Sequence, residues 1–156
     1  MTLRLEAIAA GADPEPLIGA LVPSFGGDEA GAREIIGQTL TLLTEHPRSA
    51  PWGSYIAYDG ATPIGICAFK LAPDAEGTVE IAYMTFPPFE RRGHAASMIA
   101  ELNEIAANGG AAMVIAHTLP EENASNRALR SNGFAFAGEV EDPEDGRVWR
   151  WEKARA

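Results

Sequence analysis

The hydrophobic pattern between residues 79 and 110 changes from the two-residue period of a strand to the period of a helix. Residues 79–86 are rich in β-branched and aromatic side chains, and Pro87-Pro88 ends the run because neither proline can donate to a ladder. Further along, apolar residues recur three and four positions apart, which predicts one buried helical face. They are Ala95, Met98, Ile99, Leu102, Ile105 and Ala106. The pattern therefore predicts a strand, a loop and a helix that begins near Gly93 and ends at Gly109-Gly110.

Shorter patterns predict the other elements of the chain. Asp13 and Asp28 can each cap a helix that carries apolar residues on one face. Strands are expected at residues 2–9, 54–58, 64–71, 79–86, 112–116, 134–140 and 148–152, and a last helix at residues 122–132. Together these elements predict a single α/β domain over residues 1–156, with about four helices flanking a mixed, mostly antiparallel sheet of about six to seven strands.

The composition favours a soluble globular protein. Apolar residues make up 46% of the 156 residues, which argues against intrinsic disorder, and no apolar run approaches the ~20 residues of a membrane helix. The N-terminus lacks the basic and apolar blocks of a secretory signal, and the lone Cys67 cannot form an internal disulfide. We therefore expect a cytoplasmic protein with no membrane partner. No Cys or His cluster has the spacing of metal ligands, so no metal is expected.

The net charge of −10 argues against a nucleic-acid partner, because binding a phosphate backbone needs a field of the opposite sign. An acidic surface suits a cationic substrate better. The alternative is that the charge serves only to keep the protein soluble.

The loop between the predicted strand and helix, residues 90–95, combines Arg91, Arg92 and Gly93 with small residues. The first N–H groups of a helix have no partner within the helix, and the positive end of its dipole adds to the two arginines. An anion, above all a phosphate, can bind there. The alternative is an ordinary strand-to-helix turn, which also favours glycine and surface arginine.

This loop resembles the acetyl-CoA pyrophosphate loop of the GCN5-related N-acetyltransferases (the GNAT superfamily). That pattern is Gln or Arg, two residues, Gly, one residue, then Gly or Ala; Gly93 and Ala95 match its fourth and sixth positions, whereas Glu90 departs from the first. A second segment, residues 122–127 followed by Asn132-Gly133-Phe134, resembles the later helix and strand of the family. The resemblance covers most of the chain and is greatest to the branch of ribosomal-protein alanine acetyltransferases, the RimJ/RimL-like enzymes.

The resemblance implies a GNAT-like fold and direct transfer of an acetyl group from acetyl-CoA to a primary amine, on a small molecule or a polypeptide N-terminus. It implies no metal, and dimers are common among such folds. The residues that it places at the cofactor are Met84, Phe86, Arg91, Arg92, Gly93, His94, Ala95, Ala96 and Asn123. For the side chain of His94, the alternatives are a place beside the phosphates and plain exposure to solvent.

The resemblance also suggests catalytic residues. Glu80 lies on the central strand, where the family often has a carboxylate that deprotonates the amine. One alternative is that His117 is the base, and the other is that Glu80 only positions the substrate. A backbone N–H near Met84 would stabilise the oxyanion if the strand bulges from its neighbour. Leu129 stands where many members have a tyrosine acid, which leaves Ser125, with Asn123, near the cofactor thiol. Asn and Ser at a helix start are also ordinary N-caps.

Two other functions are considered. A non-catalytic acyl-CoA-binding or sensing domain would explain the missing tyrosine and the Glu90 departure. A nucleotide-binding α/β domain is disfavoured because the chain has neither a Walker-type nor a Gly-x-Gly-x-x-Gly loop. Cys67 lies in an apolar run, where thiols are usually buried and inert, which argues against covalent catalysis. The acceptor amine has no sequence signature.

Overall fold

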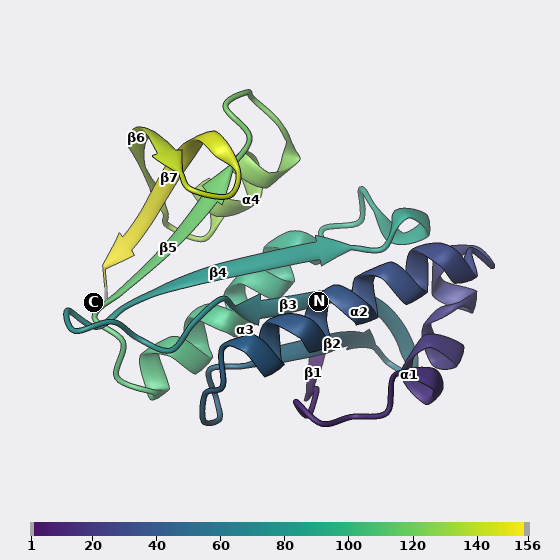
Figure 1. Ribbon diagram of the computed structural model, residues 1–156. Coiled ribbons are helices and arrows are strands. Elements are labelled where there is room, and N and C mark those ends of the chain that lie inside the picture. The colour runs from purple at the N-terminus through teal and green to yellow at the C-terminus, as the bar shows by residue number, and fades with distance from the viewer. Residues whose placement is uncertain (1, 155–156) are drawn as a thin grey trace.

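The computed structural model describes residues 2–154, which form one open seven-stranded sheet with helices on both faces (Figure 1). The strand order is β1-β2-β3-β4-β5-β7-β6, and among the described residues only the β4–β5 pair is parallel. The strands are β1 (Arg4–Ala7), β2 (Ser54–Asp59), β3 (Thr62–Phe69), β4 (Thr78–Thr85), β5 (Met113–Thr118), β6 (Ala135–Asp142) and β7 (Gly146–Ala154). The helices are α1 (Pro14–Leu21), α2 (Glu29–Glu45), α3 (His94–Asn108) and α4 (Ala124–Ser131), with short 3-10 turns at Pro23–Phe25 and Pro87–Phe89.

The predicted fold class is confirmed, with seven strands and four helices in the expected order. Asp13 and Asp28 cap α1 and α2 as expected, each accepting a hydrogen bond from a backbone N–H of the first turn. The last helix begins at Ala124, two residues later than predicted, because Asn123 adopts an extended conformation and serves as its N-cap. The predicted domain range, 1–156, includes Met1 and residues 155–156, which lie outside the described residues.

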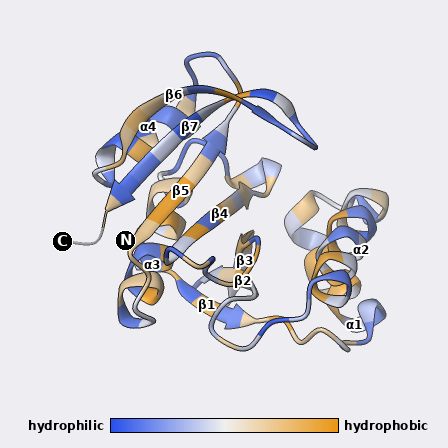
Figure 2. Cartoon of the chain, turned by 60° about the vertical axis from the view of Figure 1, so that its left-hand side comes forward, coloured by the Kyte–Doolittle hydropathy of each residue, from blue (hydrophilic) through white to orange (hydrophobic). Residues whose placement is uncertain are grey.

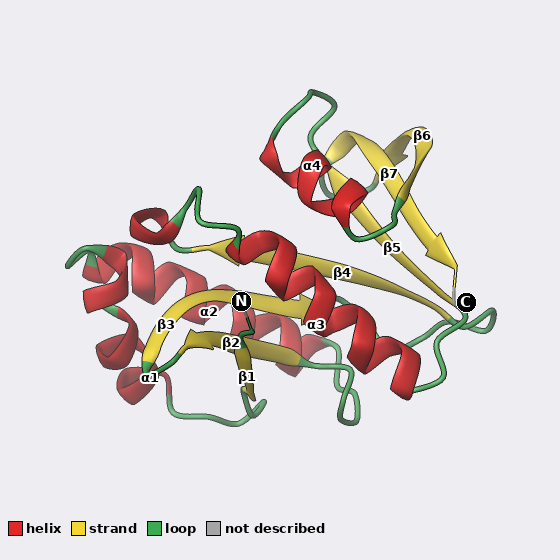
Figure 3. Ribbon diagram, turned by 180° about the vertical axis from the view of Figure 1, so that it is seen from behind, coloured by secondary structure: helices red, strands yellow, loops and turns green. Residues whose placement is uncertain are grey.

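The helices divide the core into two clusters, one on each face of the sheet (Figures 2 and 3). α1 and α2 pack on one face, where Phe86 is buried, and α3 and α4 cover the other, where Val79 and Ile81 are buried. Successive side chains of a strand point to opposite faces. On β4 the odd-numbered residues therefore face α3 and α4, and the even-numbered ones, including Glu80, face the side of α1 and α2.

The sheet opens between its two central strands. β4 and β5 pair only as far as Ile81 and Ala116, although β4 continues to Thr85 and β5 to Thr118. Beyond that point β4 stays paired with β3, and β5 stays paired with β7, so the two strands diverge (Figures 1 and 3). The expected gap beside Met84 is thus present, but the expected bulge is not its cause, because the β3–β4 register is continuous from Ile81 to Thr85.

A buried hydrogen-bond network holds the start of α4 against β5, beside this opening. The Thr118 hydroxyl donates to Asn126 Oδ1 (2.8 Å) and accepts from the indole N–H of Trp151 (3.0 Å). The Asn126 amide in turn donates to the Glu121 carbonyl (2.6 Å). Asn126 and Trp151 are both completely buried.

Thr118→Val keeps the shape of this side chain and removes its hydroxyl, which leaves Asn126 Oδ1 and the Trp151 indole N–H without a partner. We expect the free energy of unfolding to fall by about 2 to 4 kcal/mol, because each unsatisfied buried group costs about 1–3 kcal/mol. Denaturant titration measures the loss. Thr62→Val, at an exposed position of β3, is the matched control and should change stability by less than about 0.5 kcal/mol. Equal stabilities for the two variants would contradict the role of the network.

Candidate active site

A cavity of about 630 Å³ lies between the second half of β4 and the N-termini of α3 and α4. β4 lines it with Tyr83, Met84 and Thr85. The α3 side contributes Gly93, His94, Ala95 and Ala96, and the α4 side contributes Ser125 and Arg127. The structure thus brings most of the predicted cofactor residues around one cavity.

The N-terminus of α3 presents backbone donors to this cavity. Gly93 is the N-cap residue, with φ 80°, and among the described residues no side chain caps the helix. The N–H groups of His94, Ala95 and Ala96 therefore have no partner within the helix. Arg91 also has a left-handed φ, 66°, so that the loop curls around these donors. Together with the helix dipole, this geometry suits an anion, and we call these N–H groups the anion cradle; phosphate binding there stays a prediction.

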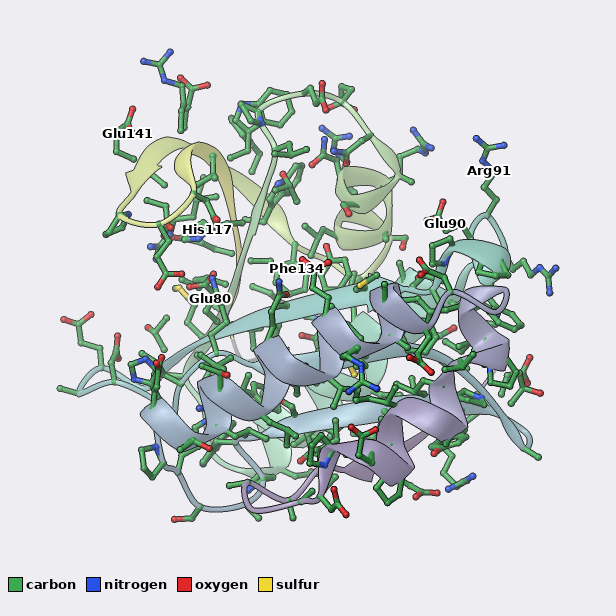
Figure 4. All side chains as sticks on the ribbon, turned by 45° about the vertical axis from the view of Figure 1, so that its right-hand side comes forward. Glu80, Glu90, Arg91, His117, Phe134 and Glu141 are labelled. Atoms are coloured by element: carbon green, nitrogen blue, oxygen red, sulfur yellow. The ribbon has the colours of Figure 1, made fainter. Side chains whose placement is uncertain are left out.

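Glu90, Arg91 and Arg92 are exposed, and Glu90 and Arg91 are also among the residues that line the cavity. The Arg92 guanidinium stacks over the Phe89 ring, 5.5 Å from its centroid. Figure 4 shows Arg91 pointing away from the sheet, with Glu90 beneath it. The cradle is therefore built by the backbone, and a side chain at position 90 is not needed to form it.

His94 does not fit the expectation of an exposed loop side chain. The imidazole is 3% exposed and lines the cavity, and its Nδ1 has no hydrogen-bond partner among the described residues. The reason is that His94 is the first residue of α3, whose buried face also carries Met98 and Leu102. Of the two expected alternatives, plain exposure is therefore wrong, and a place beside the phosphates stays a prediction.

Phe86 is a correction. Its side chain is completely buried on the α1 and α2 face, with its ring centroid 4.5 Å from that of Phe25. Its N–H donates to the Ile64 carbonyl, and its carbonyl accepts from the Phe89 N–H. Pro87–Phe89 turns the chain directly after Phe86 and fixes these contacts. Phe86 therefore supports the loop and has no group free to bind a cofactor.

The register of β4 shows which backbone groups near Met84 face the opening. Phe86 N donates to Ile64 O (2.8 Å) and Lys70 N donates to Glu80 O (2.9 Å), so the backbone groups of the even-numbered residues face β3. The N–H of Met84 faces β3 as well. The N–H and C=O groups of Tyr83 and Thr85 face the opening, where the ladder with β5 has ended. Tyr83 and Thr85 flank Met84, so they carry the backbone donors that are expected near it, and their role towards an oxyanion stays a prediction.

A second cavity, of about 300 Å³, continues from the first through the opening between β4 and β5. The two cavities share Tyr83 and Ser125, and the second also reaches Glu80, His117 and Asn123. The Asn123 side chain accepts a hydrogen bond from Asn126 N (3.1 Å), which confirms its ordinary role as an N-cap. The predicted base and the predicted Ser125 thus line one continuous space.

Tyr83 is a site residue that sequence reasoning missed. Burial raises the pKa of Tyr83 to about 12, although the neighbouring Ser125 hydroxyl works in the opposite direction. The phenol O–H makes no hydrogen bond within residues 2–154, although the Ser125 hydroxyl is close enough to lower its pKa. In the sequence Tyr83 has only the periodicity of a strand residue. The one feature of the sequence that could have pointed to Tyr83 as a site residue is its position on the same strand, three residues after Glu80.

Glu80 lies at the centre of a charged cluster on the other side of the opening. Its Oε2 is 3.2 Å from both Lys70 Nζ and His117 Nδ1, and the same histidine nitrogen is 3.9 Å from Asp142 Oδ1. Figure 4 shows Glu80 and His117 close together. Burial alone would lower the pKa of Lys70, but Glu80 and nearby aspartates outweigh it and raise that pKa. Lys70 therefore stays charged beside the carboxylate.

A third cavity, of about 250 Å³, leads from Glu80 to the surface on the α2 side. Its lining includes Leu42 and His46 of α2, and Asp142 and Glu144 at the β6–β7 turn. Glu80 is thus reached from one side by the second cavity and from the other by this third cavity, the acidic entrance.

The profile of the acetyltransferase (GNAT) domain family matches residues 5–135. The chain belongs to the GNAT acetyltransferase family. This result confirms the family inferred from the loop and makes the protein an acetyl-CoA-dependent acetyltransferase by family. No curated protein sequence matches the chain significantly.

Solved structures share the fold of this acetyltransferase at low sequence identity. The RimL ribosomal L7/L12 alpha-N-protein acetyltransferase in complex with coenzyme A has a TM-score of 0.71 at 15% identity, covering 99% of this chain and 94% of that chain. An acetyl transferase from Salmonella typhimurium, described as modifying the N-terminal serine of L7/L12, has a TM-score of 0.71 at 17% sequence identity. The match covers 100% of this chain and 96% of that chain. The aminoglycoside acetyltransferase AAC(6')-Ib in complex with coenzyme A has a TM-score of 0.73 at 18% sequence identity. The match covers 99% of this chain and 95% of that chain. The fold is therefore common to enzymes with different acceptors.

The site residues fit acetyl-CoA as the cosubstrate. The α3 N-terminus offers uncapped N–H groups for phosphates, and the unpaired edge of β4 offers Tyr83 and Thr85 for amide groups. Among residues 2–154, no group of three or more His, Cys, Asp and Glu side chains is arranged to hold a metal ion. None of the helices within that range is long and apolar enough to cross a membrane.

Gly93→Trp should weaken acetyl-CoA binding more than about tenfold, because the side chain would fill the open space in front of the cradle and strain a left-handed residue. Gly60→Trp is a matched control, since Gly60 also has a positive φ and open space around it but lies in the β2–β3 turn. Calorimetric titration of both variants with acetyl-CoA makes the comparison. If Gly93→Trp binds as tightly as Gly60→Trp, the cradle is not the phosphate site.

Proposed function

We propose that this chain transfers the acetyl group of acetyl-CoA directly to a primary amine, on a small molecule or a polypeptide N-terminus. The observation that carries the proposal is the opening between β4 and β5, which connects the anion cradle of α3 to the Glu80 cluster. Both substrates can therefore meet in one ternary complex. The cofactor enters from the α3 and α4 side, and the amine enters from the α2 side through the acidic entrance.

The acidic entrance supports a cationic acceptor. Asp142 and Glu144 line it together with Glu80, and Lys70 supplies one compensating positive charge. An alkylammonium group is attracted to such an environment, as the net charge of −10 already indicates. The same charge supports our proposal that nucleic acid is not a partner.

Glu80 is the proposed base. A primary amine with a pKa of ~10.4 must lose a proton before it can attack, and Glu80 is the carboxylate at the point where the cavities meet. Lys70 and His117 hold this carboxylate in place from two sides. The incoming amine would pass its proton to Glu80, directly or through one water, as its nitrogen reaches the thioester carbon.

The edge of β4 and Ser125 are the proposed partners of the thioester. The N–H groups of Tyr83 and Thr85 are aimed into the opening and can stabilise the developing oxyanion. Ser125, at the junction of two cavities, would lie close to the sulfur. Cys67 plays no part, because it is 1% exposed and burial raises its pKa to about 12. A cytoplasmic location and a homodimer remain proposals that rest on composition and family resemblance.

The proposal is tested by measuring CoA release from acetyl-CoA with a panel of primary amines, including cationic amines and peptide N-termini. Amine-dependent release with formation of the N-acetyl product is expected. Tight acetyl-CoA binding without release from any amine would favour the alternative, a non-catalytic acyl-CoA-binding domain.

Glu80→Gln should lower kcat by about 100-fold or more, while acetyl-CoA affinity changes by less than about twofold, because the residue faces the amine side. The remaining activity should rise with pH as more amine becomes neutral. Glu76→Gln, at an exposed turn, is the control. Full activity of Glu80→Gln at every pH, combined with loss in His117→Gln, would move the base to His117.

A further inference from the structure

Tyr83 occupies a particular place in the path between the two substrates. It is on β4, three residues from Glu80, so the two side chains point to opposite faces of the strand. Its side chain packs against the α3 and α4 core and lines both the cofactor cavity and the second cavity. Of the residues at this junction, Ser125 and Tyr83 carry side-chain hydroxyl groups that face each other from α4 and β4.

The Tyr83 hydroxyl is buried but has no hydrogen-bond partner among residues 2–154. Buried phenols usually have one, because water is lost when the group is buried. By contrast, the Tyr55 hydroxyl donates to the Pro51 carbonyl (2.6 Å). The unpaired O–H of Tyr83 is therefore available to a ligand atom in the cavity that it lines.

The position that the family resemblance gives to a tyrosine acid is closed in this chain. Leu129 is completely buried and belongs to the core cluster that also contains Trp151 and Phe134. It cannot present a polar group to the cavity. Near the departing sulfur, the side-chain hydroxyl groups at the junction of the two cavities are those of Ser125 on α4 and Tyr83 on β4.

We propose that the Tyr83 O–H donates a hydrogen bond to the thioester sulfur and stabilises the thiolate as it departs. This role rests on the proposed function. As the nitrogen–carbon bond forms, the carbon–sulfur bond breaks and its electron pair goes to sulfur. Glu80 takes one proton from the ammonium before the attack, and the nitrogen loses its second proton to solvent as the amide forms. The thiolate takes a proton from solvent after release. Tyr83 keeps its own proton throughout, in agreement with the high pKa that burial gives it.

Tyr83→Phe removes only the hydroxyl. If the O–H stabilises the thiolate, kcat should fall about 10-fold to 100-fold with acetyl-CoA affinity within about twofold, as expected for the loss of one hydrogen bond to a charged group. A second readout does not depend on turnover, namely the pKa of the thiol of CoA bound to the protein, measured by the ultraviolet absorbance of the thiolate. We expect this pKa to lie below ~8.5 in the parent and to rise by about one unit or more in Tyr83→Phe.

Stability distinguishes this role from a structural one. Because the hydroxyl makes no hydrogen bond in the free protein, Tyr83→Phe should unfold at the same denaturant concentration as the parent or at a higher one. Tyr58→Phe is the matched control. Tyr58 is on β2, its ring lies under the guanidinium of Arg4 from β1, and it lines none of the three cavities. Ser125→Ala tests the neighbouring hydroxyl under the same conditions.

The outcomes separate the two proposals. A parent protein that releases CoA with amines, combined with a Tyr83→Phe variant of unchanged kcat and unchanged bound-thiol pKa, overturns the role of Tyr83 alone. A shift of the thiol pKa in Ser125→Ala but not in Tyr83→Phe assigns the role to Ser125 instead. A parent that fails to release CoA with any amine overturns the proposed function, and the thiol pKa then decides whether Tyr83 still contacts the sulfur.

Discussion

The structure depends on the point where β4 and β5 stop pairing. Each strand has another neighbour, β3 or β7, and keeps its hydrogen bonds to that neighbour to the end. The two central strands therefore separate after Ile81 and Ala116 without breaking the outer ladders. The opening exposes backbone N–H and C=O groups of β4 at the centre of the sheet. Such groups are costly to leave unpaired in a protein interior, which explains why a peptide-like ligand suits the place.

The alternation of β4 distributes the chemistry between the two sides of this opening. Tyr83 and Thr85 face the cofactor cavity and its anion cradle, and Glu80 faces the acidic entrance. In the proposed ternary complex, one strand thus separates the two substrates and contacts both. The buried network of Thr118, Asn126 and Trp151 holds the start of α4, and with it Ser125, beside the same opening.

Much of this arrangement could be predicted from the sequence, because it depends on local signals. Helix caps such as Asp28, the run of strand residues before Pro87-Pro88 and the glycine at the mouth of α3 each act over a few residues. Two features could not be predicted, for a different reason. The expected cofactor contact of Phe86 was wrong, and the sequence left open whether the side chain of His94 is exposed. The direction of Phe86 depends on packing against Phe25, and the burial of His94 depends on α3 docking on the sheet. No local pattern reports such contacts.

The role proposed for Tyr83 could not be predicted for the same reason, since a tyrosine on a strand looks like any core residue until the cavities that it lines are known. The backbone direction of Met84 required the register with β3, which is a property of two strands and not of one. The acceptor amine depends on the shape of the entrance, which separate segments of the chain form together.

The most direct test of the central claim is backbone amide hydrogen exchange of β4, residue by residue, with and without acetyl-CoA. We predict that the amides of Tyr83 and Thr85 exchange readily in the free protein and become protected when acetyl-CoA binds, whereas the Met84 amide, which faces β3, is protected in both states. Binding of acetyl-CoA that leaves the exchange of Tyr83 and Thr85 unchanged would show that the opening between β4 and β5 does not receive the cofactor.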